Sequence, residues 1–129
     1  MSKALRFGEK AIEPLLQKYP DLVNEISTGG ATPLHMCGMG KENQNSTAYI
    51  IKMGGDIEAI DTYKYTPLHR MASNNLAIGA RALLKAGADL HTRTGQGETA
   101  KSIALETGAF DVLKVLQDFD IAPNSLDRQ

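Results

Sequence analysis

The chain has 129 residues and a formal net charge of −1, with 42% hydrophobic and 22% charged residues. These values suit one globular domain and exclude a wholly disordered chain. The near-neutral charge argues against a dedicated binder of nucleic acid or anionic membrane, and the single cysteine excludes an internal disulfide framework and a multi-cysteine zinc site. The first ten residues lack a signal-peptide core and no stretch approaches the roughly 20 apolar residues of a membrane span, so we expect a cytoplasmic or nuclear protein.

The composition favours helices over sheets. Aromatic residues make up only 5% of the chain, there is no tryptophan, and the only valines are Val23, Val112 and Val115. A sheet-rich core needs more aromatic and β-branched residues than this, whereas the abundant Ala and Leu suit close-packed helices.

Two short motifs recur along the chain with nearly the same spacing. Thr32-Pro33-Leu34-His35 returns 34 residues later as Thr66-Pro67-Leu68-His69, and Thr99-Ala100 follows after a further 33 residues. Met53-Gly54-Gly55-Asp56-Ile57 returns 33 residues later as Ala86-Gly87-Ala88-Asp89-Leu90. Two independent markers with one period predict an internal repeat.

The first two units are unequal. We expect residues 1–26 to form a partial first repeat, in which Ile12, Leu15 and Leu16 belong to the second helix and Tyr19-Pro20 ends it. Residues 27–60 form a full repeat, with one extra residue in the loop 39–47 that separates its two helices.

Residues 61–93 form the clearest unit. Thr66 can cap a helix through its hydroxyl, and Pro67 suits the first helical position, where its missing N–H costs nothing. The first helix is expected to run to about Ser73, after which Asn74-Asn75 turn the chain.

A second helix is expected over residues 77–85, ended by Gly87 in the left-handed conformation. The polar, glycine-containing residues 89–98 predict an extended connection with a turn. Residues 94–119 form a degenerate last repeat, and we expect residues 120–129 to be a frayed tail.

Such a helix pair cannot bury its own apolar face and must stack on copies of itself. The unit resembles the ankyrin repeat in its period, its Thr-Pro-Leu-His opening, its Leu83-Leu84 pair and the Gly87-Ala88-Asp89 after the second helix. The resemblance covers about residues 4–119. It implies an all-α ankyrin repeat solenoid of about four stacked helix-turn-helix units, joined by β-hairpin-like loops.

Three residues depart from the pattern of that family. Lys64 stands where the hairpin turn usually has glycine, so a positive φ there costs roughly 1 kcal/mol. Lys101 replaces a buried leucine, which suits a terminal repeat whose outer face meets water. Asp120 stands at the terminating glycine position, which is consistent with the stack ending there.

Residues that could support catalysis or metal binding have simpler structural interpretations. His35 and His69 occupy the same place in adjacent repeats, and the resemblance assigns them structural hydrogen bonds near the hairpin. Cys37 stands where the family has a small core residue, and Met71 is its counterpart in the next repeat. Residues 38–42 fail the spacing of a phosphate-binding loop. We therefore expect no enzyme activity, no catalytic residue, no cofactor and no metal.

The resemblance places partner binding on a concave face made of hairpin tips and first helices. Tyr63, Tyr65 and Arg70 are expected to centre this face, because Tyr and Arg are enriched in binding hot spots. Tyr65 could instead pack across the hairpin, and Arg70 could be a solvated head on a packed stem. The other expected contact residues are Thr62, Ser73, Asn74, Met36, Met39, Arg93, Gln96 and Glu98.

These observations favour a non-catalytic protein–protein interaction module, an adaptor or scaffold that binds one partner protein through its concave face. The alternative is a regulatory or assembly-chaperone subunit that masks an enzyme surface. We expect a monomer that binds neither nucleic acid nor membrane. By resemblance, His91 lies at a position that is hydroxylated in some animal ankyrin repeats, and its modification stays open.

Overall fold

The computed structural model describes residues 1–127, and the side chains of residue 2 and residues 121–127 are outside that description. Within this range all regular elements are helices and no strand is formed. The helices are α1 (Ser2–Leu5), α2 (Glu9–Lys18), α3 (Pro33–Cys37), α4 (Thr47–Lys52), α5 (Pro67–Ser73), α6 (Ala77–Lys85), α7 (Ala100–Thr107) and α8 (Phe110–Asp127). Short 3₁₀ turns are η1 (Pro20–Asn24), η2 (Thr28–Gly30) and η3 (Asn43–Ser46).

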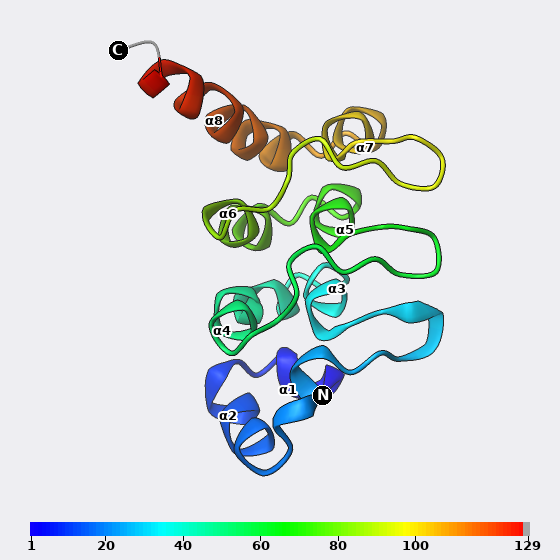
Figure 1. Ribbon diagram of the computed structural model, residues 1–129, viewed down its shortest axis with the longest axis vertical. Helices are drawn as coiled ribbons and strands as arrows, with labels where there is room; N and C mark the ends of the chain where they lie inside the picture. The colour runs from blue at the N-terminus through cyan, green and yellow to red at the C-terminus, as the bar shows by residue number, and fades with distance from the viewer. Residues whose placement is uncertain (128–129) are drawn as a thin grey trace.

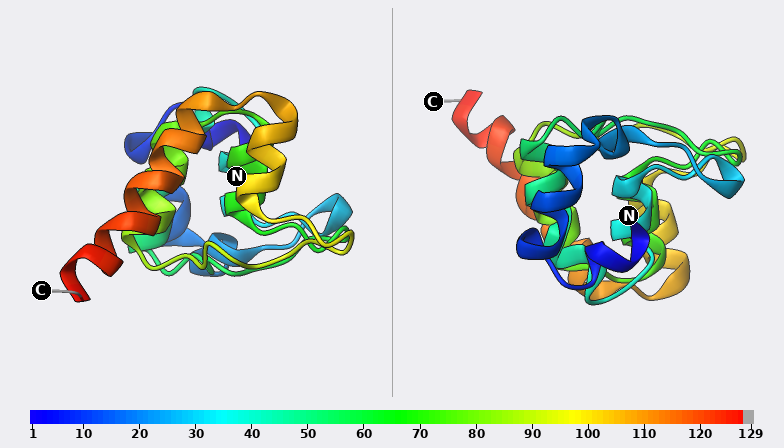
Figure 2. Two further views of the ribbon diagram at one scale, coloured as in Figure 1. Left: turned by 90° about the horizontal axis from the view of Figure 1, so that it is seen from above. Right: turned by 90° about the horizontal axis from the view of Figure 1, so that it is seen from below.

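The helices stack as successive pairs, which confirms the predicted all-α solenoid (Figure 1). The second helices α2, α4, α6 and α8 form one column, and the first helices α3, α5 and α7 form the other. The loops that connect successive pairs project beyond the first helices, and Figure 2 shows that they overlay when the stack is viewed from its ends.

The repeated Thr-Pro-Leu-His motif starts the first helices as predicted. Thr32 and Thr66 each accept the backbone N–H of the histidine three residues later, and each histidine ring accepts the threonine N–H in return. This reciprocal capping satisfies two otherwise unpaired helix N–H groups. Thr99 makes the same box with Ser102, so the third copy keeps the cap after losing the histidine.

The core is a series of layers between neighbouring pairs, and every layer uses small or aliphatic side chains. Gly79 in α6 shows how tightly the layers pack, since a Cβ there would lie 2.4 Å from Met71 Cε. Fully or almost fully buried side chains include Leu5, Ile12, Leu34, Cys37, Ile50, Leu68, Met71, Ala80, Leu83, Ala104 and Val112. Each buried leucine or isoleucine contributes about 1.5–3 kcal/mol relative to exposure.

Three equivalent turns form the tips of the connecting loops. The turns 27–31, 61–65 and 94–98 are each closed by a hydrogen bond from the N–H of the first residue to the carbonyl of the last, at 2.8–3.0 Å. Gly30, Lys64 and Gly97 have positive φ at the same turn position, so Lys64 does adopt the conformation expected of a glycine. These loops are hairpin-like although they form no strand within the described residues.

The structure differs from the predictions at both ends. The first unit has a short first helix, α1, in addition to the predicted second helix, which ends at Lys18 as expected. The last helix does not stop near Asp120, because α8 continues to Asp127. Aspartate does not force the left-handed conformation that a glycine C-cap provides, so the helix can propagate past it. The last two residues of the expected tail, 128–129, lie outside the described range.

Candidate functional site: the hairpin and first-helix face

His35 and His69 are buried structural groups, as predicted. The His35 Nδ1 atom accepts the Thr32 N–H at 3.1 Å, and its Nε2 lies 2.7 Å from the Tyr65 carbonyl, to which a neutral ring donates. His69 repeats this arrangement with the Thr66 N–H at 2.9 Å and the Thr92 carbonyl at 2.8 Å. Both ring nitrogens are therefore engaged, so neither histidine presents a lone pair to a metal or substrate.

Cys37 is fully buried, and burial raises the pKa of its thiol to about 12. Because the thiolate is the reactive form, such a thiol is a poor nucleophile. Among residues 1–127, excluding the undescribed side chains, no three His, Cys, Asp or Glu residues are grouped so as to hold a metal ion. Over the same range no helix is long and apolar enough to cross a membrane.

A buried aspartate organises the central hairpin. The Asp61 carboxylate accepts the N–H groups of Tyr63 at 2.9 Å and Tyr65 at 3.0 Å. Its second oxygen accepts two bonds from the Arg70 guanidinium, of which the Nε bond is 3.1 Å long. Burial opposes ionisation of Asp61, but the Arg70 and backbone hydrogen bonds outweigh it and lower the pKa of the carboxyl.

Tyr65 links this network to the neighbouring elements. The Arg70 guanidinium lies over its ring at 4.2 Å from the centroid, and the His69 ring packs edge-on at 5.7 Å. Its hydroxyl donates to Glu98 of the next hairpin at 3.3 Å. Burial and then the Glu98 carboxylate raise the pKa of the Tyr65 phenol. Tyr65 therefore packs across the hairpin, which is the interpretation the sequence had left open.

Five of the predicted contact residues line one hollow of about 500 Å³ between two hairpin tips. These are Thr62, Tyr63, Tyr65, Arg70 and Gln96, and they are joined there by Lys64 and Gly95. Tyr63 is 67% exposed, and within the described part of the chain its hydroxyl makes no hydrogen bond. It is therefore the large side chain in this hollow that is freest to be covered by a partner.

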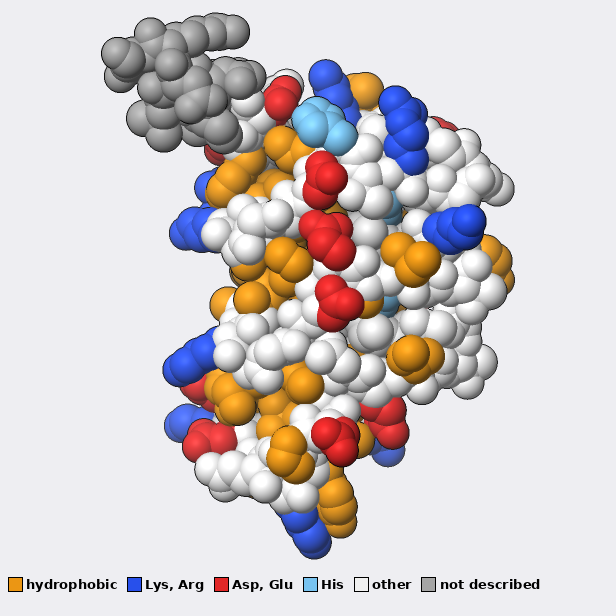
Figure 3. Space-filling model, in the orientation of Figure 1, with side chains coloured by type: hydrophobic (Ala, Val, Ile, Leu, Met, Phe, Trp, Pro, Cys, Tyr) orange, Lys and Arg blue, Asp and Glu red, His pale blue; other side chains and the backbone are white. Residues whose placement is uncertain are grey.

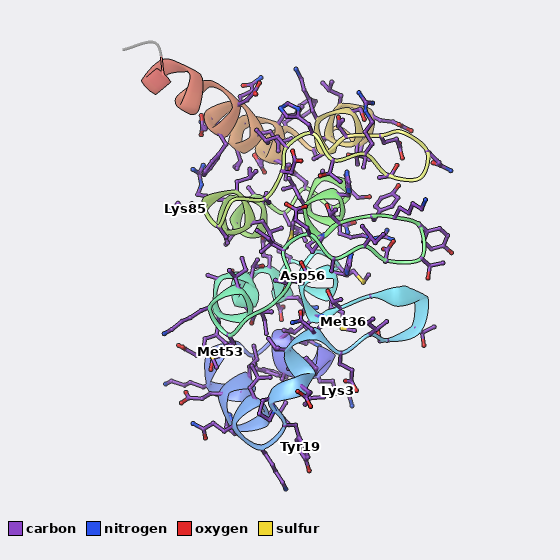
Figure 4. The ribbon with its side chains drawn as sticks, viewed as in Figure 1. Lys3, Tyr19, Met36, Met53, Asp56 and Lys85 are labelled. Carbon is purple, nitrogen blue, oxygen red and sulfur yellow. The ribbon has the colours of Figure 1, made fainter. Side chains whose placement is uncertain are left out.

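The remaining predicted residues lie elsewhere on the face. Met39 and Asn74 line a separate hollow at the turn between the first and second helices. Asn74 also donates to the Gly38 carbonyl at 2.7 Å, and Arg93 donates to the Gly97 carbonyl at 2.8 Å. Met36, Ser73 and Glu98 are half-buried; Figure 4 labels Met36, which lies on α3 toward the base of the hairpins.

Sequence reasoning missed Asp61 and Gly38. Asp61 begins the 61–65 turn, and an aspartate at the start of a turn is the usual acceptor for N–H groups two residues on, so the signal was present. Gly38 leaves room for Arg70, because a Cβ at that position would lie 2.6 Å from Arg70 Cβ. That contact joins residues of two different repeats, and no local pattern predicts it.

The comparisons with known proteins agree with this geometry. Residues 50–104 match a family model described as ankyrin repeats. The chain is 36% identical over 80 residues to Ankyrin repeat and SOCS box protein 18 of Homo sapiens, which covers 61% of the chain and 17% of that protein. It is 29% identical over 85 residues to Palmitoyltransferase ZDHHC13 of Mus musculus, covering 65% of the chain and 14% of that protein.

A further relative is NF-kappa-B inhibitor alpha of Gallus gallus, 32% identical over 95 residues, covering 71% of the chain and 30% of that protein. The chain therefore spans less than a third of the length of each of these relatives. What they share with it is the repeat. The stacked helix pairs, the reciprocal Thr–His caps and the match over residues 50–104 show that this chain belongs to the ankyrin repeat family.

Proposed function

We propose that this chain is a non-catalytic protein–protein interaction module that binds a partner protein through the face formed by its hairpin tips and first helices. Ankyrin repeats are generally protein–protein interaction modules, which supports the class of function. The observation that carries the proposed site is the hollow between the hairpins at residues 61–65 and 94–98, which holds an exposed tyrosine. We further propose an intracellular location, cytoplasmic or nuclear.

The mechanism is binding to a surface that is already ordered. The bonds from Arg70 to Asp61 and from Tyr65 to Glu98 fix the walls of the hollow before a partner arrives. A partner that covers Tyr63 then loses little additional conformational entropy on the side of this chain. Tyr63 supplies amphipathic contact area, and the neighbouring Thr62 and Gln96 offer hydrogen-bonding groups.

The test replaces Tyr63 with alanine and compares partner capture with that of wild type. Tyr19→Ala is the matched control, because Tyr19 is also exposed, at 51%, and lies at the end of α2 away from the hairpins. Figure 4 labels Tyr19 at the far end of the stack. We expect Tyr63→Ala to lose at least about tenfold in affinity for captured proteins and Tyr19→Ala to retain it. Equal capture by both variants would contradict the proposed face.

Tyr63 is a sharper probe than Arg70 or Tyr65. Removing Arg70 would leave the buried Asp61 carboxylate without its cationic partner, at a cost of about 1–3 kcal/mol in stability. Within the described residues the Tyr63 side chain makes no hydrogen bond or ion pair, so an alanine there separates an effect on capture from an effect on folding, which urea unfolding checks.

A second candidate is a regulatory subunit that masks a partner's surface. The similarity to a protein named as an inhibitor, NF-kappa-B inhibitor alpha, favours it. The same face would serve both functions. Once a partner is captured, its activity would be measured with and without this chain: inhibition relieved by Tyr63→Ala supports masking, and unchanged activity supports an adaptor.

A further inference from the structure

An open groove lies on the side of the stack opposite the hairpins. It has a volume of about 590 Å³ and runs across the outer column of second helices. Ala48 and Ile51 of α4 and Val115 of α8 contribute to its ends. Its remaining lining residues all belong to α6 or its C-cap: Ala77, Ile78, Arg81, Ala82, Lys85 and Ala86.

The groove has an apolar floor and a purely positive rim. Seven of its nine lining residues are Ala, Ile or Val, and the other two are Arg81 and Lys85. Ile78 is 59% exposed, so apolar surface is left uncovered. Figure 3 shows hydrophobic side chains along this edge of the molecule, with Lys and Arg side chains projecting from it, and Figure 4 labels Lys85 on the outer side of α6.

Among the described side chains, one ion pair partly neutralises this rim. Arg81 lies 3.6 Å from Asp118 of α8, but both side chains are about half exposed, and such pairs contribute little. Lys85 is exposed at the end of α6, and no acidic residue lines the groove. The complementary ligand therefore combines an apolar surface with acidic groups at its edges.

The walls of the groove favour a helical ligand over an extended one. They are built from α4, α6 and α8, whose backbone groups bond within their own helices and offer no free edge to an extended strand. A helix satisfies its own N–H and C=O groups and can insert side chains spaced three and four residues apart. The alanines of the floor permit close approach of a second helix.

We propose that this outer groove is a docking site for an amphipathic helix of a partner protein whose apolar stripe is flanked by Asp or Glu. The apolar stripe packs on Ile51 and the exposed Ile78, and the acidic residues pair with Arg81 and Lys85. The site is separate from the hairpin face, so the two proposals stand or fall independently. The chain would then hold two partners on opposite sides.

The probe is a synthetic helix-stabilised peptide of about 18 residues, since three stacked helices span about 20 Å and a helix rises 1.5 Å per residue. It carries leucines on one stripe, glutamates beside that stripe and a fluorescein label, and binding to the full chain is followed by fluorescence anisotropy. The control peptide has lysine in place of every glutamate. We expect saturable binding of the glutamate peptide that weakens with added salt, and none of the lysine peptide.

Variants locate the binding. Arg81→Glu with Lys85→Glu should weaken it at least about tenfold, whereas Lys64→Glu with Arg93→Glu, which changes the net charge equally on the hairpin side, should leave it within about twofold. Ala48→Gln fills the floor without changing charge and should weaken binding at least about fivefold. Urea unfolding midpoints confirm that each variant is folded.

The proposal would be overturned by the absence of saturable binding, by equal binding of both peptides, or by an equal loss in the hairpin-side control. Self-association of the chain that Ala48→Gln abolishes in sedimentation velocity would also overturn it, because the occupant would then be a second copy. Sedimentation with anionic vesicles that depends on Arg81 and Lys85, without peptide binding, would likewise replace the helix with a lipid surface.

Discussion

At the scale of single residues, Lys64 has a strained backbone conformation in the hairpin turn. It adopts φ of 61° at the turn position where the two equivalent turns have glycine. A non-glycine residue with positive φ is strained by its Cβ, at about 1 kcal/mol.

We therefore predict that Lys64→Gly raises the free energy of unfolding by about 0.5–1 kcal/mol in urea titrations. Lys41→Gly is the control, because Lys41 is also an exposed loop lysine but is not among the positive-φ residues. It should be neutral or slightly destabilising, since glycine adds unfolded-state entropy. A loss of stability in Lys64→Gly would mean that the lysine side chain makes a stabilising contact that outweighs the strain.

Residue-level roles were predictable where the partner is near in sequence. The cap by the Thr66 hydroxyl lies within three residues and was predicted, whereas the return bond from the Thr66 N–H to the His69 ring was not. The bond from Arg70 to Asp61 spans 9 residues and depends on how the hairpin folds onto α5, and the bond from Tyr65 to Glu98 spans 33 residues and depends on the stacking of two units. For this reason the sequence placed Tyr65 and Arg70 near the hairpin, where the structure also has them, without distinguishing an internal contact from a free side chain.

At the scale of elements, asparagines of one repeat satisfy backbone groups of the next. Asn75 Oδ1 accepts the N–H groups of Asp111 and Val112, at 3.1 and 3.2 Å, in the first turn of α8. Asn24 makes a related link, accepting the Asp56 N–H at 2.8 Å and donating to the Gly54 carbonyl at 3.0 Å. The first N–H groups of a helix lack intrahelical partners, so Asn75 serves α8 as a cap supplied from a distance.

Replacing Asn75 tests this cap. Asn75 has φ of 55°, so Asn75→Gly keeps the backbone conformation and removes only the side chain. We predict a loss of about 1 kcal/mol in stability and faster hydrogen exchange at the Asp111 and Val112 amides. Exchange at the Ile103 amide, which bonds to the Thr99 carbonyl inside α7, is the internal reference. Unchanged exchange at all three amides would show that Asn75 does not cap α8.

The helix bounds were predictable to the residue in the central unit because both ends carry signals. The structure gives Pro67–Ser73 and Ala77–Lys85 for helices expected to end near Ser73 and to span 77–85. The end of the last helix was not predicted, because α8 continues past Asp120 and also past Pro123, a residue type that usually ends or kinks a helix. The groove on the outer column was also missed, since it forms where helices of three repeats meet.

At the scale of the whole molecule, two buried neutral histidines make folding sensitive to pH. Burial lowers the pKa of both His35 and His69, although their carbonyl partners oppose that shift. As pH falls, the unfolded chain therefore takes up protons before the folded chain does. The contribution of these groups is complete above about pH 6.5 and is lost as pH falls through their lowered folded-state pKa values.

We predict that the free energy of unfolding falls between pH 7.5 and pH 5 by up to about 1.4 kcal/mol per pH unit for each histidine. Other groups also titrate, so the variant His35→Gln with His69→Gln isolates the effect: its stability should depend less on pH than that of wild type. Parallel stability profiles for the two proteins in urea titrations would contradict this assignment.

The two histidines also give the stack a direction. Each ring reaches forward to a carbonyl in the chain that leads toward or into the next hairpin, His35 to Tyr65 and His69 to Thr92. In the third cap the corresponding residue is Ser102, whose hydroxyl donates to the Thr99 carbonyl of its own helix at 3.0 Å. Each of these two histidines therefore links its own unit to the chain that follows it. Under a pulling force we therefore expect the first unit, residues 1–26, to separate before the others, because it has no Thr-Pro-Leu-His motif and no histidine that links it to the next unit.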